Sequence, residues 1–213
     1  MKTNEATYEI QYGNVRRPTH YNTSWDEARF EVCAHKWLDV SEDGYGISVL
    51  NDCKYGCDVH NGRIGLTMLK SATYPNPDAD KEHHSFIWSL CPHSGRWQEN
   101  QIVAKAYLLN NPYRAVIKQK DGGSLAKTYS AVSVNVPNVV IEVVKKAEDG
   151  DETIIRMYEC WNRRSRFELQ LSEPAEYVYE TNLLEEKQEE IPVKENKVSL
   201  EIRPFEIKTL VVY

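Results

Sequence analysis

The sequence predicts an all-β protein. Many short segments alternate apolar and polar residues, and this two-residue period is typical of strands with one buried face. In the second half of the chain, tight polar turns such as 148–151 separate these segments at fairly regular spacing, as in a compact antiparallel sandwich. A helical spacing of apolar residues stands out only at 97–109, where it predicts a short helix or helical crossover that Asn110 to Pro112 ends.

The expected strands follow the alternation in chain order. The run 139–144 is almost continuously apolar, which predicts a strand buried on both faces. Trp88 and Trp161 lie within alternating segments and are expected in the core. The acidic run 185–190 is expected as a solvated loop or a strand edge. The predicted strands are residues 8–12, 29–34, 45–50, 63–69, 85–90, 132–136, 139–144, 154–161, 166–171, 177–179, 198–202 and 207–213.

The polar, glycine-bearing stretch 119–124 is the best candidate for a domain boundary. With 213 residues, the chain has room for one large β domain or two small ones. We therefore expect one domain over residues 1–118 and a second, smaller one over 119–213.

Composition excludes several classes of protein. A net charge of −6 without a basic block argues against nucleic acid as a partner. No apolar run is long enough to span a membrane, and the N-terminus lacks the apolar centre of a signal peptide. The odd, scattered count of five cysteines argues against a secreted disulfide framework. A reduced, cytoplasmic location is expected.

The polar stretch from Asn51 to Gly56 follows the strand predicted at 45–50 and is the first candidate site. Asn51 and Asp52 offer acceptors, and Lys54 and Tyr55 offer donors, which is the mixture that sugar hydroxyls require. The alternative is a polar turn in which Asn51 and Asp52 only cap the backbone. A role for Asp52 as a general acid or base is a further alternative.

Two other groups of residues carry candidate chemistry. His20 and Trp25 lie close together in sequence, and an exposed indole can stack on a sugar ring; the alternative is a structured loop. Cys53, Cys57 and His60 lack the tight spacing of structural zinc sites, so buried free thiols are the simpler interpretation. No metal ligand and no catalytic residue are assigned.

Five stretches of the first half together resemble one family. They are residues 17–26, 29–37, 50–56, 73–80 and the pair Pro92–His93. In this order they resemble the C-terminal region of the glycoside hydrolase family 38 α-mannosidases, over roughly residues 8–112. The closing stretch 203–209 and the strands before it resemble the small terminal sandwich of the same enzymes.

The resemblance implies part of a galactose-mutarotase-like β super-sandwich followed by a smaller antiparallel β-sandwich. The family's catalytic barrel, with its zinc ion and aspartate nucleophile, and its helical bundle are expected outside this chain and as its partners. The intact enzyme would hydrolyse α-mannosides with retention. This chain alone would be inactive, bracing the barrel and lining the substrate cleft with Asn51, Asp52, Lys54, Tyr55, His20 and Trp25.

Two other functions stay open. One is a stand-alone carbohydrate-binding sandwich. The other is a sugar epimerase, which would need a carboxylate and a histidine in one cleft. A chain that lacks its partners would also expose strand edges, so a homo-oligomer is a further expectation.

Overall fold

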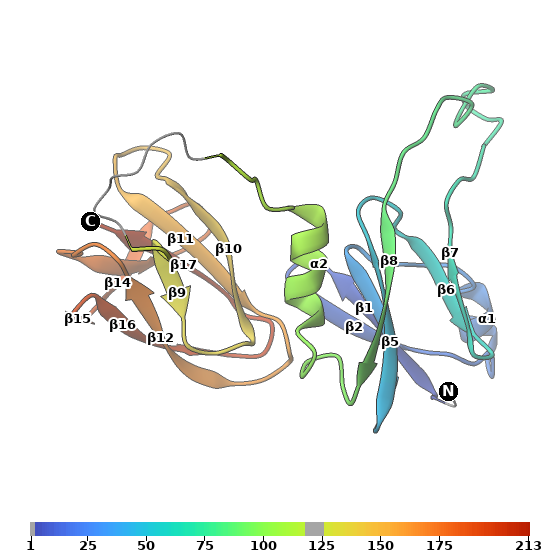
Figure 1. The fold of residues 1–213 in the computed structure, drawn as a ribbon, viewed down its shortest axis with the longest axis horizontal. Helices are drawn as coiled ribbons and strands as arrows, with labels where there is room; N and C mark the ends of the chain where they lie inside the picture. Colours follow the sequence, from blue (N-terminus) through green and yellow to red (C-terminus); the bar gives the residue numbers. More distant parts are fainter. Residues whose placement is uncertain (1–2, 118–125) are drawn as a thin grey trace. The chain divides into compact units, whose positions relative to one another are not determined.

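A computed structural model describes residues 3–117 and 126–213, and the strands confirm the all-β prediction. The chain forms two compact units, Met1–Arg114 and Ala115–Tyr213, and each is described by itself (Figure 1). Within the described residues, 3–117 and 126–213, no helix is long and apolar enough to cross a bilayer.

The first unit is built on a five-stranded antiparallel sheet of order β2-β1-β4-β5-β8. A second sheet, of order β3-β6-β7, covers part of one face, and the two enclose a core of Tyr8, Leu38, Val49, Cys57 and their neighbours. The strands are β1 (Glu5–Ile10), β2 (Gly13–Pro18), β3 (Val32–Cys33), β4 (Trp37–Glu42), β5 (Tyr45–Asn51), β6 (Gly56–His60), β7 (Arg63–Leu66) and β8 (Trp88–Ser94).

Two helices complete this unit. The short helix α1 (Ser24–Ala28) begins at a capping box, because the Thr23 hydroxyl accepts from the Asp26 N–H and the Asp26 carboxylate accepts from the Thr23 N–H. Helix α2 (Ile102–Asn110) buries Ile102, Val103 and Ala106 and contacts β4 and β5. It packs on the face of the five-stranded sheet opposite to β3-β6-β7.

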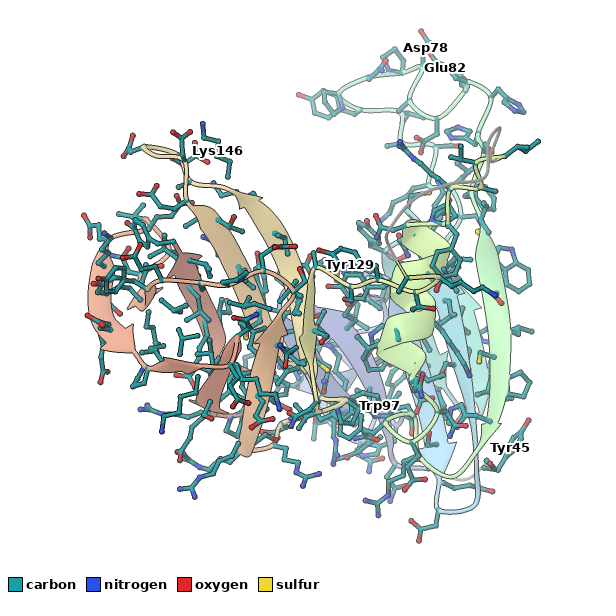
Figure 2. All side chains as sticks on the ribbon, turned by 60° about the vertical axis from the view of Figure 1, so that its left-hand side comes forward. Tyr45, Asp78, Glu82, Trp97, Tyr129 and Lys146 are labelled. Atoms are coloured by element: carbon teal, nitrogen blue, oxygen red, sulfur yellow. The ribbon has the colours of Figure 1, made fainter. Side chains whose placement is uncertain are left out.

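The connection between β7 and β8, residues 67–87, extends far from the sandwich (Figure 1). Figure 2 shows Asp78 and Glu82 at its distant end. A connection of this length without regular secondary structure is uncommon in a compact domain, and such segments are usually either functional loops or linkers.

The second unit is an antiparallel sandwich, with sheets of order β10-β11-β17-β13-β14 and β15-β16-β12-β9 face to face (Figure 1). Its core includes Met157, Leu169, Val178, Val198 and Leu210. The strands are β9 (Val132–Val134), β10 (Val139–Lys146), β11 (Thr153–Glu159), β12 (Ser165–Leu171), β13 (Val178–Thr181), β14 (Lys187–Ile191), β15 (Val193–Lys194), β16 (Lys197–Ile202) and β17 (Ile207–Val212).

Several predicted elements differ from the structure in extent. The strand expected at 29–34 is reduced to β3, because α1 and a turn occupy the residues before it. The strand expected at 85–90 begins at Trp88 and continues to Ser94. The helix expected from 97 begins at Ile102, since residues 97–101 form a turn that ends with Gln101 in a left-handed conformation. The strands β2, β4 and β6 were not predicted.

Two predictions of burial are wrong. Strand β10 lies at the edge of its sheet, and Val144 is 52% exposed, so the apolar run there has neighbours on one side only. Trp88 is 49% exposed, because β8 is an edge strand that the smaller sheet does not cover. The acidic run is confirmed as a strand edge, as part of β14. The boundary expected at 118–119 lies outside the described residues.

Candidate functional site

The turn after β5 is held by Asn51, whose side chain points inward. Asn51 is 3% exposed. Its amide Nδ2 donates to the His35 carbonyl at 2.6 Å, and its Oδ1 accepts from the Lys54 N–H at 2.7 Å. The last residue of α2, Asn110, donates to the Asn51 carbonyl at 3.0 Å. Asn51 therefore shapes the turn, and its role as a sugar contact stays a prediction.

Asp52 connects the turn to the base of loop 67–87. Its N–H donates to the Ile87 carbonyl at 3.1 Å. The hydrogen bond from the Cys53 thiol lowers the pKa of the Asp52 carboxyl, and the same bond raises the pKa of the Cys53 thiol. One carboxylate oxygen, Oδ1, is buried without a hydrogen-bond partner among the described residues. This oxygen is thus closed to solvent, and the Asp52 side chain serves the turn.

The thiols make this arrangement testable. We expect iodoacetamide to label exposed Cys33 and Cys53 in the folded protein, and to label Cys57 and Cys160 only after unfolding. Burial raises the pKa of Cys57 to about 12, which further suppresses its thiolate. Substitution of Asp52 with asparagine should lower the pKa of Cys53 and speed its labelling several-fold at pH 8, as followed by mass spectrometry. An unchanged rate at Cys53, with Cys33 as the internal control, would contradict the predicted thiol–carboxylate bond.

Lys54 and Tyr55 lie at the same end of the first unit as loop 67–87. The Lys54 ammonium is 5.1 Å from the centre of the Phe86 ring. Its charge also contributes to lowering the pKa of Asp80. Tyr55 is 45% exposed, and its ring centre is 5.0 Å from that of His35. Lys54 thus acts on Asp80, and Asp52 and Tyr55 are its close neighbours in the chain. We call these four residues, Asp52, Lys54, Tyr55 and Asp80, the rim.

Asp80 braces the loop. Its Oδ2 accepts from the Ser71 N–H at 2.9 Å and from the Lys70 N–H at 3.4 Å. These backbone bonds lower the pKa of Asp80. Its carbonyl oxygen lies 3.1 Å from His84 Nε2. The two sides of the loop are thereby joined. Asp80 was not among the predicted site residues, although it lies within the stretch 73–80 that carries the family resemblance.

His20 and Trp25 lie elsewhere. The His20 neighbour Tyr21 stacks on His60, with ring centres 3.8 Å apart, and His60 is at the opposite end of β6 from Gly56. The length of β6 separates the two ends by roughly 13 Å. Trp25, on α1, is 75% exposed, as expected for a surface residue. The structure therefore brings Asp52, Lys54 and Tyr55 together and leaves His20 and Trp25 apart from them.

A carboxylate and a histidine meet in the first unit, but they are buried. His93 Nε2 lies 2.8 Å from Asp39 Oδ2, and both side chains are 1% exposed. Ser48 donates to Oδ2 at 2.7 Å, Ser41 donates to Oδ1, and His93 Nδ1 faces the Gly95 carbonyl at 3.1 Å. Because both ring nitrogens are engaged, the pair has no free nitrogen with which to move a proton of a sugar. Nothing in the local sequence pattern marked Asp39 as buried.

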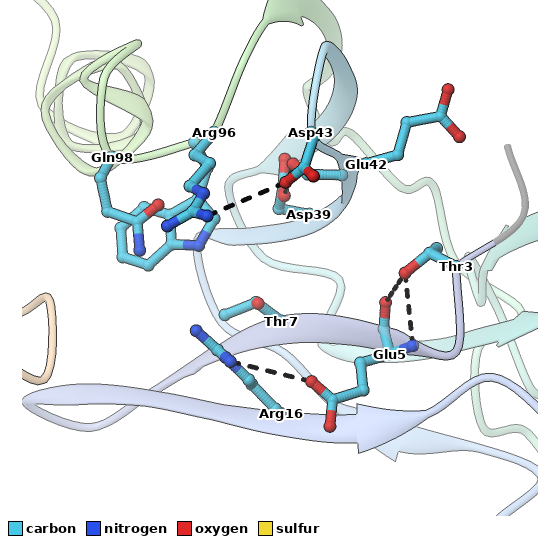
Figure 3. Close-up of a pocket in the computed structure, with 11 residues that line it drawn as sticks. Thr3, Glu5, Thr7, Arg16, Asp39, Glu42, Asp43, Arg96 and Gln98 are labelled. Carbon is cyan, nitrogen blue, oxygen red and sulfur yellow. Dashed lines mark hydrogen bonds and ion pairs between the residues drawn. The ribbon is translucent and has the colours of Figure 1, made fainter.

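Asp39 forms part of the wall of a surface hollow of about 270 Å³ (Figure 3). Its charges pair with one another: Arg16 lies 3.8 Å from Glu5, and Arg96 lies 3.8 Å from Asp43. Two further carboxylates, Asp39 and Glu42, also line the hollow, so it is polar and carries more acidic than basic groups. Across residues 3–117 and 126–213, no three His, Cys, Asp or Glu side chains are grouped as metal ligands. We derive no metal-dependent step from these residues.

Comparison with known families places both units. Residues 1–78 match the glycosyl hydrolases family 38 C-terminal domain. Residues 138–210 match the glycosyl hydrolases family 38 C-terminal beta sandwich domain. Both matches agree with the resemblance found in the sequence. One lies in the first unit and the other in the second.

Whole-chain relatives are named α-mannosidases. Alpha-mannosidase 2C1 of Homo sapiens is 39% identical over 217 residues, which cover 100% of this chain and 21% of the relative. Alpha-mannosidase G of Dictyostelium discoideum is 39% identical over 216 residues, covering 98% of this chain and 20% of the relative. The chain thus spans about a fifth of the length of these curated relatives.

The fold is also that of solved mannosidase structures. An alpha-mannosidase from Enterococcus faecalis V583 superposes with a TM-score of 0.78 at 20% identity, over 100% of this chain and 24% of that one. At this identity the likeness concerns the fold, and it covers both units. This chain belongs to glycoside hydrolase family 38, and its two units match the two C-terminal domains of that family.

Proposed function

We propose that this chain is the non-catalytic C-terminal part of a cytoplasmic α-mannosidase, and that its rim borders the substrate cleft. The observation that carries the proposal is that Lys54 lies near Asp80, with the half-exposed phenol of Tyr55 next to it in the chain. Donors and acceptors side by side suit the adjacent hydroxyls of a mannoside. None of the five cysteines forms a disulfide, in keeping with a reducing compartment.

The rest of the activity belongs to the proposed whole enzyme. Its nucleophile and its zinc ion would lie on a catalytic barrel outside this chain, since the relatives are about five times as long. The chain would brace that barrel and the helical bundle. His20 and Trp25 stay predictions for a separate sugar contact, and Trp25 has the exposed indole that such a contact needs.

The isolated chain is expected not to hydrolyse mannosides. A chromogenic α-mannoside with and without added zinc should give no turnover above the buffer rate, because the rim supplies no nucleophile paired with a general acid. The positive control is the human relative named above under the same conditions. Clear zinc-dependent turnover by the purified chain would overturn this part of the proposal.

The rim is tested by a chimera in which this chain replaces the matched C-terminal residues of the human relative. We expect Lys54→Met to lower kcat/KM for an α-mannoside about tenfold, as loss of one charge-assisted hydrogen bond predicts. Methionine keeps the apolar stem against Phe86, so the thermal stability should not change. Lys146→Met, at an exposed lysine of the second unit, is the matched control.

Equal kcat/KM for the Lys54→Met chimera and its control would exclude Lys54 from the cleft. Binding of mannose by the isolated chain, lost in Lys54→Met, would instead favour the alternative of a stand-alone carbohydrate-binding module. Isothermal titration of the isolated chain with methyl α-mannoside distinguishes the two.

A further inference from the structure

Strand β8 presents apolar side chains to solvent at an open sheet edge. It is the last strand of its sheet, and Trp88 and Leu90 are 49% and 58% exposed. Ile87, just before the strand, is also exposed. The unpaired N–H and C=O groups of such an edge strand can pair with another strand. Proteins with an exposed edge strand usually carry features that prevent this pairing.

The exposed side chains continue a buried row. Leu38 of β4 is opposite Val49 of β5, and Val49 is opposite Leu90 of β8. Leu38 and Val49 are buried under the sheet β3-β6-β7, whereas Leu90 is not. The three-stranded sheet therefore ends before β8. On the side of β8, the apolar face of the five-stranded sheet therefore has no layer over it among the described residues.

The backbone N–H and C=O groups of Trp88 and Leu90 also point away from the sheet. The Asp52 N–H donates to the Ile87 carbonyl, and the Gly95 N–H donates to the Gly44 carbonyl. Hydrogen-bonded pairs alternate along an antiparallel ladder, so the register directs the N–H and C=O groups of Trp88 and Leu90 away from β5. Pro92, in the same phase, has no N–H to offer. The open edge is thus competent for pairing at Trp88 and Leu90.

Three other edge strands of the five-stranded sheets are protected. The outer strand β2 carries Arg16 and Arg17, and β14 carries Lys187, Glu189 and Glu190. Strand β10 has a bulge between Ile141 and Val143 and ends in two lysines. Charges and bulges of this kind discourage pairing. Strand β8 has neither at Trp88 and Leu90.

We propose that β8 is the docking edge for an extended, apolar strand from the part of the mannosidase outside this chain, with a second layer that covers Trp88 and Leu90. This inference rests on the proposed function, and it names the surface through which the chain braces the catalytic part. The relatives carry about four fifths of their length outside the matched region. Pairing with β8 of a second copy would satisfy the edge but leave the apolar row uncovered, so a homo-oligomer fits less well.

Hydrogen exchange of the segment 86–91 tests the proposal in the chimera with the human relative. In the isolated chain, the Trp88 and Leu90 amides should exchange quickly. In the chimera we expect them to slow about 100-fold, because a partner strand accepts from them. Fast exchange in both proteins would overturn the proposal. Slow exchange in the isolated chain together with a dimer by light scattering would also overturn it, in favour of self-association.

A substitution gives a second, independent measurement. Leu90→Lys should leave the melting temperature of the isolated chain unchanged, since the side chain is exposed there, but lower that of the chimera by about 3 °C or more. Val144→Lys, at an exposed valine of β10, should be neutral in both. Equal effects of Leu90→Lys in the two proteins would exclude docking at β8. Because no rim residue is changed, the result is distinct from that of Lys54→Met.

Discussion

Replacement of Asp39 with alanine is expected to lower the free energy of unfolding of the first unit by about 3–5 kcal/mol. The carboxylate accepts from Ser41, Ser48 and His93 in a buried position, and alanine would leave all three donors without their acceptor. Urea denaturation followed by tryptophan fluorescence measures the change, because Trp37 and Trp97 pack against each other near this site.

Asp43→Ala is the matched control for Asp39. Asp43 is fully exposed and lies 3.8 Å from Arg96, so its loss should change the stability by less than about 0.5 kcal/mol. A cost below about 1 kcal/mol for Asp39→Ala would show that the buried network contributes little. His93→Gln separates the histidine bond from the two serine bonds, and we expect it to cost less than Asp39→Ala.

Replacement of Glu159 with alanine should have a similar effect on the second unit, at about 3 kcal/mol or more. Glu159 is fully buried at the end of β11. Its Oε1 accepts from Asn138 at 2.9 Å and from the Trp161 N–H at 2.7 Å, and its Oε2 accepts from the Phe205 N–H at 3.1 Å. One carboxylate thus holds three turns at one end of the sandwich.

The measurement for Glu159 is thermal unfolding together with hydrogen exchange at the Trp161 and Phe205 amides, which should lose protection first. Glu159→Gln keeps the shape of the side chain and should cost less than alanine. The control is Glu201→Ala, since Glu201 is exposed and pairs only with Arg166, at 2.6 Å. If Glu159→Ala were as mild as Glu201→Ala, the carboxylate would not be what orders these turns.

The sequence predicted the strands well where one face is buried. The alternation at 166–171 and 198–202 corresponds to β12 and β16, whose inward residues Leu169 and Val198 are fully buried. It failed where burial depends on position within a sheet. Neither the edge location of β10 nor the exposure of Trp88 follows from local periodicity, because both depend on which strands lie beside them.

The candidate site stays a prediction. Its residues were selected by composition, which does not give the orientation of a side chain. The amide of Asn51 points inward and bonds the backbone of His35 and Lys54. Asp39 and Glu159 were not recognised at all, since polar residues in alternating segments normally face solvent. Their burial becomes visible only when residues distant in sequence are brought around them.

The inward amide of Asn51 has a consequence for which positions can vary among family 38 homologues. Asn51 gives the turn its shape, and Asn110 connects the turn to α2. The side chains at positions 54 and 55 are therefore not needed to hold the turn. Substitutions there can alter the groups that the proposed rim would offer to a sugar, while the backbone keeps its conformation. Homologues that favour different mannose linkages should therefore vary at 54 and 55 and retain asparagine at 51, a pattern that an alignment sorted by substrate would reveal.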